Sequence, residues 1–357
     1  MSMTVSLCMI VRNEEAVLGR CLDSVAGLFD EIIVTDTGSQ DGTKRIAARH
    51  GARIYDFPWC DDFAAARNAC FSHATSDFLF WMDADDVLTE KNRDGFLALK
   101  LELTPATDVV MMPYETAFDE DGRATFIFLR ERMIRRTLPH RWEGYVHEVL
   151  CYEGCETVSD VAVTHKSVKT SYSDRNLRLY ESHMKRGDPF TPRDLFYWGR
   201  ELFYHGRDRE AKEILTAFLA HPGGWEENKI DACRLLGTIE ARADGLAAAL
   251  SAYARTFCFG APRAEVCTDI GQLLSDAGEW QGAIFWFRAA LEASMPRDSR
   301  GFRDETRARF DPLLGLCVCY DRLGDREQAL HYHRRAAALR PSAPAVLYNQ
   351  RYFGLES

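Results

Sequence analysis

The sequence lacks the segments that carry a protein into or through a membrane. No run of 18 apolar residues occurs in the 357-residue chain, and its N-terminus has no basic start followed by an apolar stretch and a cleavage site. The 11 cysteines show no metal-finger spacing, and cysteines without a framework favour a reducing compartment. We therefore expect a cytoplasmic protein with no membrane span.

Two further absences limit the function. The formal net charge of −10 argues against a nucleic-acid partner, because phosphate contacts need concentrated Lys and Arg. No G-x-G-x-x-G motif and no Walker loop follows an apolar run, so dinucleotide binding fails its first test. What is present is a globular composition, 46% hydrophobic and 27% charged, in a length that suits two domains.

The first half alternates apolar runs with helical patterns. The apolar runs lie at residues 5–11, 31–35, 53–55 and 78–82, and the helical patterns between them at 16–28, 42–50 and 63–74. Such alternation predicts right-handed crossovers and a parallel, doubly wound sheet. Shorter apolar pieces after residue 109 predict an antiparallel extension. We expect this α/β domain to occupy residues 1–170.

The second half, residues 171–357, shows no strand pattern. Four helix–turn–helix outlines share a polar turn with a glycine, at Gly206, Gly245, Gly278 and Gly324, spaced by 39, 33 and 46 residues. Without a polar insertion at residues 296–306 the period is near 34, the length of a tetratricopeptide unit. An irregular helical bundle is the alternative. Either way the sequence predicts an all-α domain that performs no chemistry.

The most informative stretch is residues 77–86, Asp-Phe-Leu-Phe-Trp-Met-Asp-Ala-Asp-Asp. An apolar run with aromatics and no Gly or Pro is typical of a strand buried in a parallel sheet. Three carboxylates follow it at the sheet edge where ligands bind, and such acids repel one another unless a cation screens them. The segment predicts a divalent metal. The alternative is that Asp85 or Asp86 caps a helix formed by residues 89–100.

The ends of the first two strands are also polar. Residues 12–15 follow the first strand, and residues 36–43 form a Gly-containing turn after the second. A buried acid there, Asp36, suits recognition of a base N–H. In the alternative interpretation Asp36 caps a turn that Gly42 merely permits.

Together these motifs resemble family 2 glycosyltransferases of the GT-A fold. The resemblance covers residues 4 to about 166 and depends on residues 6–15 (Ser-Leu-Cys-Met-Ile-Val-Arg-Asn-Glu-Glu), 36–39 and 41–43 (Asp-Thr-Gly-Ser and Asp-Gly-Thr), 66–68 (Ala-Arg-Asn) and 83–86 (Asp-Ala-Asp-Asp). The chain looks most like members fused to tetratricopeptide repeats, which include the peptide S-glycosyltransferases of glycocin biosynthesis. It also resembles lipopolysaccharide-core glucosyltransferases over the catalytic domain.

The resemblance implies a nucleoside diphosphate sugar as donor, with uridine the expected base. The metal would be Mn²⁺ or Mg²⁺, bound by Asp85 and by His165 at the end of a later apolar strand. Asp36 would accept the base N–H, Arg67 would face the base or diphosphate, and Asp83 would hold ribose or a metal-bound water. The implied donor-binding residues are Val11, Asn13, Glu14, Asp36, Arg67, Asp83, Ala84 and Asp85.

The acceptor side is expected in residues 141–148 (Arg-Trp-Glu-Gly-Tyr-Val-His-Glu). The resemblance places the catalytic base at Glu148, which would take a proton from the attacking group. His147 is the rival both for this task and for metal binding. A nearby basic cluster, residues 130–141, is either a loop that closes on the diphosphate or a solvated edge strand.

The leading hypothesis is a metal-dependent, inverting glycosyltransferase that transfers a sugar to a peptide or protein. Helical repeats form extended surfaces that hold polypeptides, and this favours such an acceptor. A glycan or lipid-linked acceptor is the first alternative, and a binding adaptor with a vestigial catalytic domain is the second. The sequence leaves open whether the chain forms a homodimer.

Overall fold

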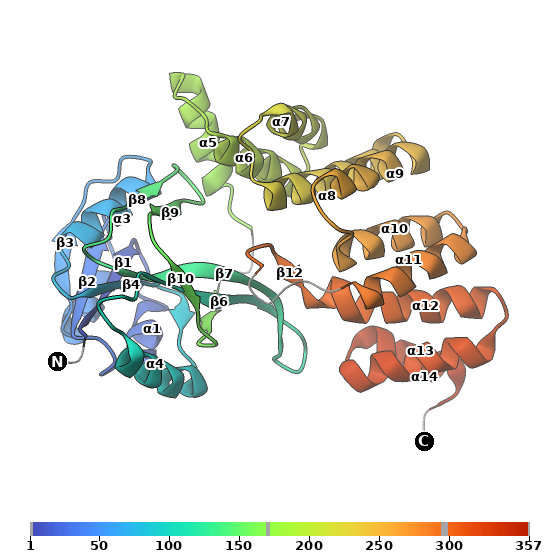
Figure 1. Ribbon diagram of the computed structural model, residues 1–357, viewed down its shortest axis with the longest axis horizontal. Helices are drawn as coiled ribbons and strands as arrows, with labels where there is room; N and C mark the ends of the chain where they lie inside the picture. The colour runs from blue at the N-terminus through green and yellow to red at the C-terminus, as the bar shows by residue number, and fades with distance from the viewer. Residues whose placement is uncertain (1–2, 169–171, 294–298, 356–357) are drawn as a thin grey trace. The chain divides into compact units, whose positions relative to one another are not determined.

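A computed structural model describes residues 3–168, 172–293 and 299–355 (Figure 1). Contacts divide the chain into two compact units: residues 1–116 with 128–197, and residues 117–127 with 198–357. The first unit continues past residue 170, where we placed the end of the α/β domain. Its last part packs on it, since the Tyr180 hydroxyl donates to the Val146 carbonyl at 3.2 Å. The domain limit itself stays a prediction.

The first unit is built on a mixed sheet. Its parallel part has the order β3-β2-β1-β4, and β7 follows antiparallel to β4. These strands are β1 (Val5–Val11), β2 (Glu31–Asp36), β3 (Arg53–Asp56), β4 (Phe78–Trp81) and β7 (Ala124–Arg135). Because Val11 pairs with Asp36, the ends of β1 and β2 lie side by side, as the sequence predicted.

The predicted antiparallel extension is only partly correct, because β4–β7, β5–β11 and β8–β9 pair antiparallel whereas β10 and β11 pair parallel with β6. It continues from β7 through β6 and β11 to β5, β10 pairs with β6, and β8 and β9 form a separate two-stranded sheet. The bounds are β5 (Asp86–Val87), β6 (Val109–Phe118), β8 (His140–Glu143), β9 (Val149–Tyr152), β10 (Glu156–Val158) and β11 (Val163–His165). Thus β11 returns the chain to the acidic end of β4.

Helices cover both faces of this sheet (Figure 1). On β4, Phe78 and Phe80 belong to a core with α1 and α4, whereas Leu79 and Trp81 belong to a core with α3. Burial on both faces explains why the strand reads as a continuous apolar run. The helices are α1 (Leu18–Ser24), α2 (Thr43–Arg49), α3 (Phe63–Ser72) and α4 (Glu90–Glu102).

The helix-cap interpretation of the acidic segment is wrong. The residue that precedes α4 at its N-cap position is Thr89, and no side chain caps the helix. Asp86 instead begins strand β5. The three carboxylates therefore need another explanation.

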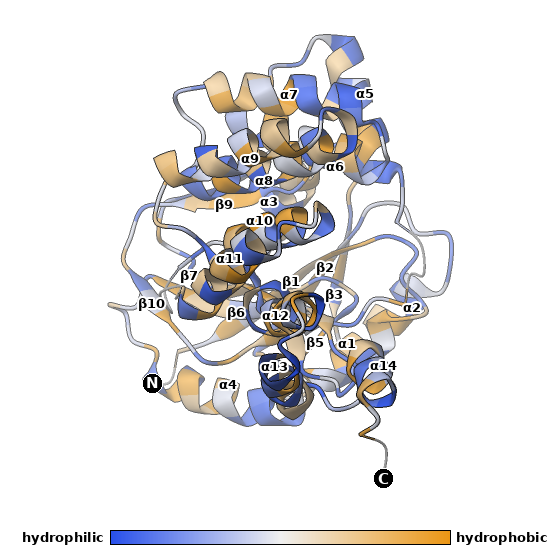
Figure 2. Ribbon diagram, turned by 90° about the vertical axis from the view of Figure 1, so that its right-hand side faces the viewer, coloured by the Kyte–Doolittle hydropathy of each residue, from blue (hydrophilic) through white to orange (hydrophobic). Residues whose placement is uncertain are grey.

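Helices make up the C-terminal part, and in Figure 2 each of α10 and α11 carries both hydrophobic and hydrophilic stretches. The helices are α5 (Arg175–Arg186), α6 (Pro192–Tyr204), α7 (Asp208–Ala220), α8 (Glu226–Ala243), α9 (Leu246–Ala254), α10 (Ala264–Asp276), α11 (Trp280–Glu292), α12 (Asp311–Arg322), α13 (Arg326–Leu339) and α14 (Pro344–Phe353). Among the described residues, the predicted all-α character is confirmed apart from the two-residue strand β12 (Arg303–Asp304).

The four predicted turns join α6 to α7, α8 to α9, α10 to α11 and α12 to α13. Their glycines all have positive φ, from 70° to 83°, which non-glycine residues rarely adopt: Gly206, Gly245, Gly278 and Gly324. Within the pairs, glycines also allow close packing, since a Cβ at Gly237 would lie 2.4 Å from the Tyr253 ring. The helix-pair repeat is therefore confirmed.

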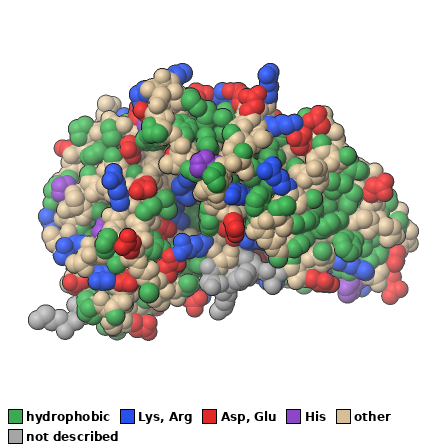
Figure 3. All heavy atoms as spheres, turned by 45° about the horizontal axis from the view of Figure 1, so that its top comes forward, with side chains coloured by type: hydrophobic (Ala, Val, Ile, Leu, Met, Phe, Trp, Pro, Cys, Tyr) green, Lys and Arg blue, Asp and Glu red, His purple; other side chains and the backbone are tan. Residues whose placement is uncertain are grey.

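The polar insertion is only partly described, because residues 296–298 lie outside the described residues. Its remaining part includes the short strand β12 (Arg303–Asp304), which pairs with Phe126 and Ile127 of the β6–β7 hairpin inside the second unit. No helix within the described ranges is both long and apolar enough to cross a membrane. On the face in Figure 3, acidic and basic side chains are intermixed.

One buried carboxylate stabilises the start of β2. Glu31 accepts hydrogen bonds from Ser6 Oγ at 2.5 Å and from the N–H groups of Thr75 and Ser76 at 2.5 and 3.1 Å. Burial opposes ionisation, but these donors lower the pKa of Glu31 to about 2. A carboxylate with a lowered folded-state pKa stabilises the fold above its ordinary pKa and loses that contribution as the pH falls toward 2.

We predict that Glu31→Gln lowers the free energy of unfolding by about 1–3 kcal/mol at pH 7, because three donors lose a charged acceptor. The loss should shrink between about pH 4.5 and pH 2, where the wild type also loses the charge. Urea denaturation at several pH values measures both effects. Glu102→Gln, at an exposed helix end, is the control, and an equal loss at all pH values would contradict the prediction.

Candidate active site

The loops after β1 and β2 are joined by hydrogen bonds through residues of the first two motifs. The Asn13 N–H donates to Ser39 Oγ at 2.9 Å, the Gln40 N–H donates to Asn13 Oδ1 at 2.8 Å, and the Glu14 N–H donates to Thr43 Oγ1 at 2.7 Å. Asn13 has a φ of 54°, in the left-handed region that Asn tolerates best among non-glycine residues. The two loops therefore form one fixed edge beside the strand ends.

Asp36 lies at this edge, and only one of its two carboxylate oxygens accepts hydrogen bonds from the described residues. Its Oδ1 accepts the N–H groups of Gly38 and Ser39 at 2.9 and 2.8 Å. Its Oδ2 is buried and has no hydrogen-bond partner among the described residues. A buried acceptor without a donor is costly, so this oxygen suits a ligand N–H. The turn-capping interpretation of Asp36 accounts for Oδ1 only.

Arg67 of α3 lies between two tryptophans and two carboxylates. Its Nη2 donates to Asp83 Oδ1 at 2.7 Å and its Nε donates to Glu148 Oε1 at 2.5 Å. Its guanidinium carbon is 4.7 and 5.0 Å from the ring centres of Trp81 and Trp142. These contacts fix the guanidinium in one orientation.

The charges in this cluster support one another. Burial alone would lower the pKa of Arg67, but Asp83 and Glu148 raise it above its ordinary value. Burial likewise opposes ionisation of Asp83, yet Arg67 and Arg132 lower the pKa of this carboxyl to about 2. Asp83 and Arg67 are therefore both ionised at neutral pH.

The neighbouring Asn68 fixes the segment that carries Glu148. Its amide donates to the Trp142 carbonyl and accepts from the Trp142 N–H, both at 2.9 Å. These two hydrogen bonds join the Ala-Arg-Asn motif, residues 66–68, to the segment 141–148. The motif thus has two tasks, since Arg67 contacts the carboxylates and Asn68 contacts the backbone.

Glu148 and His147 have different surroundings. Glu148 is 9% exposed, and its Oε1 accepts from Arg67 Nε. The His147 ring stacks on Tyr197 with ring centres 4.3 Å apart, and its carbonyl accepts from Arg193 Nε at 2.8 Å. Only Glu148 therefore contacts Arg67, while the base assignment stays a prediction.

The structure brings Asp85, Asp86 and His165 together, with one ligand atom of each within 4.8 Å of the others. His165 Nδ1 is 3.5 Å from Asp85 Oδ1, and Asp85 also accepts the Lys166 N–H through its carbonyl at 2.8 Å. Carboxylate and imidazole suit manganese, and magnesium is compatible with the carboxylates. His147 is not in this group. Metal binding by Asp85 and His165 remains a prediction.

The sequence named Asp86 among the three acids but did not predict its partners, Arg132 and Tyr114. Asp86 is fully buried and pairs with Arg132 at 3.1 Å, and Arg132 is also fully buried. The Tyr114 hydroxyl donates to Asp86 Oδ1 at 2.8 Å. The available signal for Arg132 was a run of three charged residues, Arg130-Glu131-Arg132, between apolar ones on β7, whereas Tyr114 gave no signal.

Both interpretations of the basic cluster are wrong for β7. This strand lies between β4 and β6, so it is not an edge, and it is not a loop. Arg130 and Arg132 instead lie over the Trp81 ring, with guanidinium carbons 4.7 and 3.9 Å from its centre. Arg135 pairs with Asp108 in an ion pair away from this ring.

The remaining predicted donor-binding residues, Val11 and Ala84, are 3% and 5% exposed at the ends of β1 and β4. The predicted site residues therefore lie at one edge of the sheet or on segments that contact it. None of their assigned roles is tested by this geometry.

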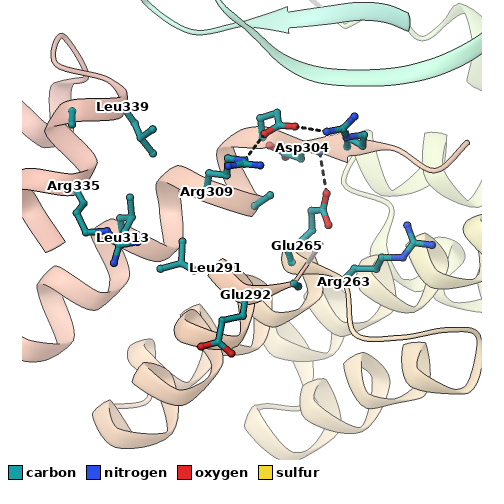
Figure 4. Close-up of a pocket in the computed structure, with 15 residues that line it drawn as sticks. Arg263, Glu265, Leu291, Glu292, Asp304, Arg309, Leu313, Arg335 and Leu339 are labelled. Carbon is teal, nitrogen blue, oxygen red and sulfur yellow. Dashed lines mark hydrogen bonds and ion pairs between the residues drawn. The ribbon is translucent and has the colours of Figure 1, made fainter. Parts of the chain in front are cut away.

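The second unit contains a cavity of about 530 Å³ (Figure 4). Its lining includes Leu291, Leu313 and Leu339, with Glu292 and Arg335 close to the first two of these leucines (Figure 4). The lining also includes Glu265 and Arg309. Glu265 accepts the Asp304 N–H at 3.1 Å, and burial raises its pKa although Arg234 opposes this. The cavity suits a ligand with both apolar and polar groups.

We predict that Arg67→Gln lowers the free energy of unfolding by about 3–5 kcal/mol, since it leaves Glu148 and Asp83 without their cation. Glu148→Gln should lower the free energy of unfolding less when it is added to Arg67→Gln than when it is made in the wild type, with a coupling energy of about 1–3 kcal/mol. Chemical denaturation of the two single variants and the double variant measures this coupling.

The exposed pair Arg209–Glu213, 3.4 Å apart with side chains 93% and 64% exposed, provides a matched control cycle. Exposed helical pairs contribute about 0.3–0.5 kcal/mol. Equal coupling in the two cycles would show that burial does not strengthen the Arg67 pair.

Comparison with known proteins gives a family for the first half. The model described as Glycosyl transferase family 2 matches residues 6–153. The SPbeta prophage-derived glycosyltransferase SunS of Bacillus subtilis is 30% identical over 258 residues, which cover 66% of this chain and 58% of that protein. A TPR repeat-containing protein of Synechococcus elongatus is 52% identical over 84 residues, which cover 24% of this chain and 21% of that protein.

This chain thus spans less than two thirds of the length of these curated relatives. Among solved structures, YrrB, described as a TPR protein with an unusual peptide-binding site, is similar at a TM-score of 0.37 and 19% identity, covering 50% of this chain and 83% of that chain. The predicted fold class, an α/β domain followed by tetratricopeptide-like helix pairs, is confirmed. The match to the family 2 glycosyltransferase model is confined to residues 6–153, which hold all the motifs that carry the predicted resemblance except His165.

Proposed function

We propose that the protein is a metal-dependent, inverting glycosyltransferase that moves a sugar from a UDP-sugar to a side chain of a peptide or protein. The observation that carries the proposal is the gathering of Asp85, Asp86 and His165 at the carboxyl end of β4, next to the segment that matches the family 2 model. At the same sheet edge lie a buried acceptor for a base and a buried carboxylate for proton transfer.

Donor binding begins with the base. Asp36 Oδ2 has no hydrogen-bond partner among the described residues, and it would accept the N3–H of uracil. Asn13 and Glu14 would line the nucleoside pocket with Val11, and Arg67 would face the base or the diphosphate. Asp83 and Ala84 would contact the ribose side of the donor.

The cation side of the site is formed by Asp85 and His165. A divalent cation, Mn²⁺ or Mg²⁺, would neutralise the charge that develops on the departing diphosphate. Asp83, held ionised by Arg67, would orient the donor beside it.

Glu148 would accept the proton of the attacking group. Its Oε1 is bound by Arg67, so Oε2 would be the oxygen that takes the proton. Attack from the face opposite the departing diphosphate inverts the anomeric centre. The acceptor's proton ends on Glu148, and the bonding electrons of the broken glycosyl bond leave with the diphosphate.

The peptide acceptor is favoured by the second unit. Its helix pairs resemble repeats that hold polypeptides, and its cavity is lined by both apolar and charged side chains. An extended peptide presents both kinds of group at short intervals. A glycan acceptor would use hydroxyl-binding polar groups throughout, and the three leucines of the cavity do not offer them.

The proposal is tested by incubating the protein with a panel of nucleotide sugars and peptides that contain Cys, Ser or Thr. We expect nucleotide release that requires Mn²⁺ or Mg²⁺ and stops with chelator, and a peptide that gains the mass of one sugar. Transfer to oligosaccharides alone would favour the glycan alternative. Absence of both nucleotide release and nucleotide binding would leave only a binding adaptor.

We predict that Asp85→Ala abolishes turnover, with a loss of at least about 10³-fold, because the diphosphate charge is no longer neutralised. Glu148→Gln should retain UDP binding and lose transfer by about 10²–10⁴-fold. Calorimetry with UDP and a transfer assay separate the two effects. Glu143→Gln, an exposed acid of the same segment, is the control. Normal transfer in Glu148→Gln would show that another group is the base.

We also predict that Asp36→Asn weakens UDP binding by about 10–100-fold, since an amide N–H would replace the open acceptor. The ratio of the CDP Kd to the UDP Kd should also fall in this variant. Calorimetric titration with both nucleotides measures this. Asp56→Asn is a matched control, because Asp56 is the register partner of Asp36 on β3. Equal UDP affinity in Asp36→Asn and wild type would contradict the proposed base contact.

A further inference from the structure

Asp86 belongs to the group of possible metal ligands, but both of its carboxylate oxygens already accept hydrogen bonds. Oδ1 accepts the Tyr114 hydroxyl at 2.8 Å. Oδ2 accepts from Arg132 Nη1 and from the Asp83 N–H, both at 3.1 Å. The carboxylate is fully buried and its charge is balanced by the fully buried Arg132. Asp86 therefore has the surroundings of a structural acid, unlike Asp85.

The hydrogen bonds around His165 determine which ring nitrogen is protonated. Nδ1 lies 3.0 Å from the Tyr114 hydroxyl oxygen, 3.3 Å from Asp86 Oδ1 and 3.5 Å from Asp85 Oδ1, so only acceptor oxygens surround it once the Tyr114 hydrogen is donated to Asp86. Because the Tyr114 hydrogen is donated to Asp86, its oxygen can only accept, so the hydrogen between the two residues belongs to Nδ1. In a neutral imidazole the lone pair then lies on Nε2. A metal binds a ring nitrogen through its lone pair, so Nε2 is the nitrogen that could bind it.

Regular structure holds this arrangement in place. His165 pairs with Asp86 across the β11–β5 ladder, and Val163 of β11 pairs with Tyr114 of β6. The Arg132 guanidinium carbon lies 4.2 Å from the centre of the Tyr114 ring. All the partners therefore come from strands or strand ends, which leaves the imidazole little rotational freedom.

We propose that Asp86 and Tyr114 are positioning residues that hold His165 in the Nδ1–H tautomer and leave Nε2 as the ligand atom for the cation. The inference rests on the proposed metal-dependent function and extends it to residues that no motif assigns. Hydrogen bonds to the distal nitrogen of a metal-binding histidine fix its ring and tautomer, and their loss typically lowers metal affinity by 10–100-fold. The rival explanation is that Asp86 binds the cation directly.

The test compares Mn²⁺ binding by the whole chain with and without the Tyr114 hydroxyl. Free Mn²⁺ is measured by electron paramagnetic resonance in the presence of UDP for wild type and Tyr114→Phe. We expect Kd to rise about 10–100-fold, because the ring keeps its packing and loses only the hydrogen bond. Tyr152→Phe also removes a tyrosine–carboxylate hydrogen bond, to Glu156 at 2.6 Å, and should leave Kd unchanged.

A second measurement does not depend on a variant of the network. Nitrogen-15 spectra of the His165 ring in the wild type, at a pH where the ring is neutral, should show a protonated Nδ1 and an unprotonated Nε2. His165→Gln assigns the signals among the 10 histidines.

The outcomes separate the two proposals. Wild-type Mn²⁺ binding with an unchanged Kd in Tyr114→Phe, or a protonated Nε2 in the spectra, overturns this inference and leaves the proposed function standing. No Mn²⁺ binding by the wild type overturns the metal-dependent function and this inference with it.

Discussion

The ion pairs of Arg67 are the interaction on which the candidate site depends. One buried guanidinium joins α3 to Asp83, 16 residues away, and to Glu148, 81 residues away, between the rings of Trp81 and Trp142. Taking such charges out of water is expensive and is offset only when the geometry satisfies both partners. Here each carboxylate receives a separate N–H of the guanidinium. A single side chain therefore joins the acidic segment directly to residue 148 of the segment 141–148.

The same principle explains how three aspartates coexist at the end of one strand. Each faces a different positively charged or potentially charged partner: Asp83 faces Arg67, Asp85 faces His165, and Asp86 faces Arg132. Their burial also differs, because Asp86 is enclosed while the Asp83 side chain is 35% exposed. Identical residue types thus acquire separate tasks from their surroundings. The exposed and partly exposed acids can meet a ligand, and the enclosed one can only support its neighbours.

Much of the fold was predictable because its signals are local. An apolar run without Gly or Pro identified β4, and four turn glycines identified the helix pairs, where a positive φ is needed. The site was predictable only where a motif and a strand end coincide, as at Asp36 and the acidic segment. Tyr114 and Arg132 escaped because their importance comes from pairing across β5, β6, β7 and β11, which no local pattern encodes. The β7 arginines were misread for the same reason, since strand order decides whether a strand is an edge.

The contact between Arg67 and Glu148 also bears on the kind of acceptor that suits this site. In the proposed reaction the base, Glu148, would act while its Oε1 stays bound to the buried guanidinium. A nucleophile that gives up its proton readily asks least of such a base. A cysteine thiol, with an ordinary pKa of about 8.5, meets this condition far better than a serine hydroxyl. Among the peptide acceptors of the proposed reaction, the electrostatics of the site therefore favour a thiol, and the same buried pair that stabilises the fold narrows its chemistry.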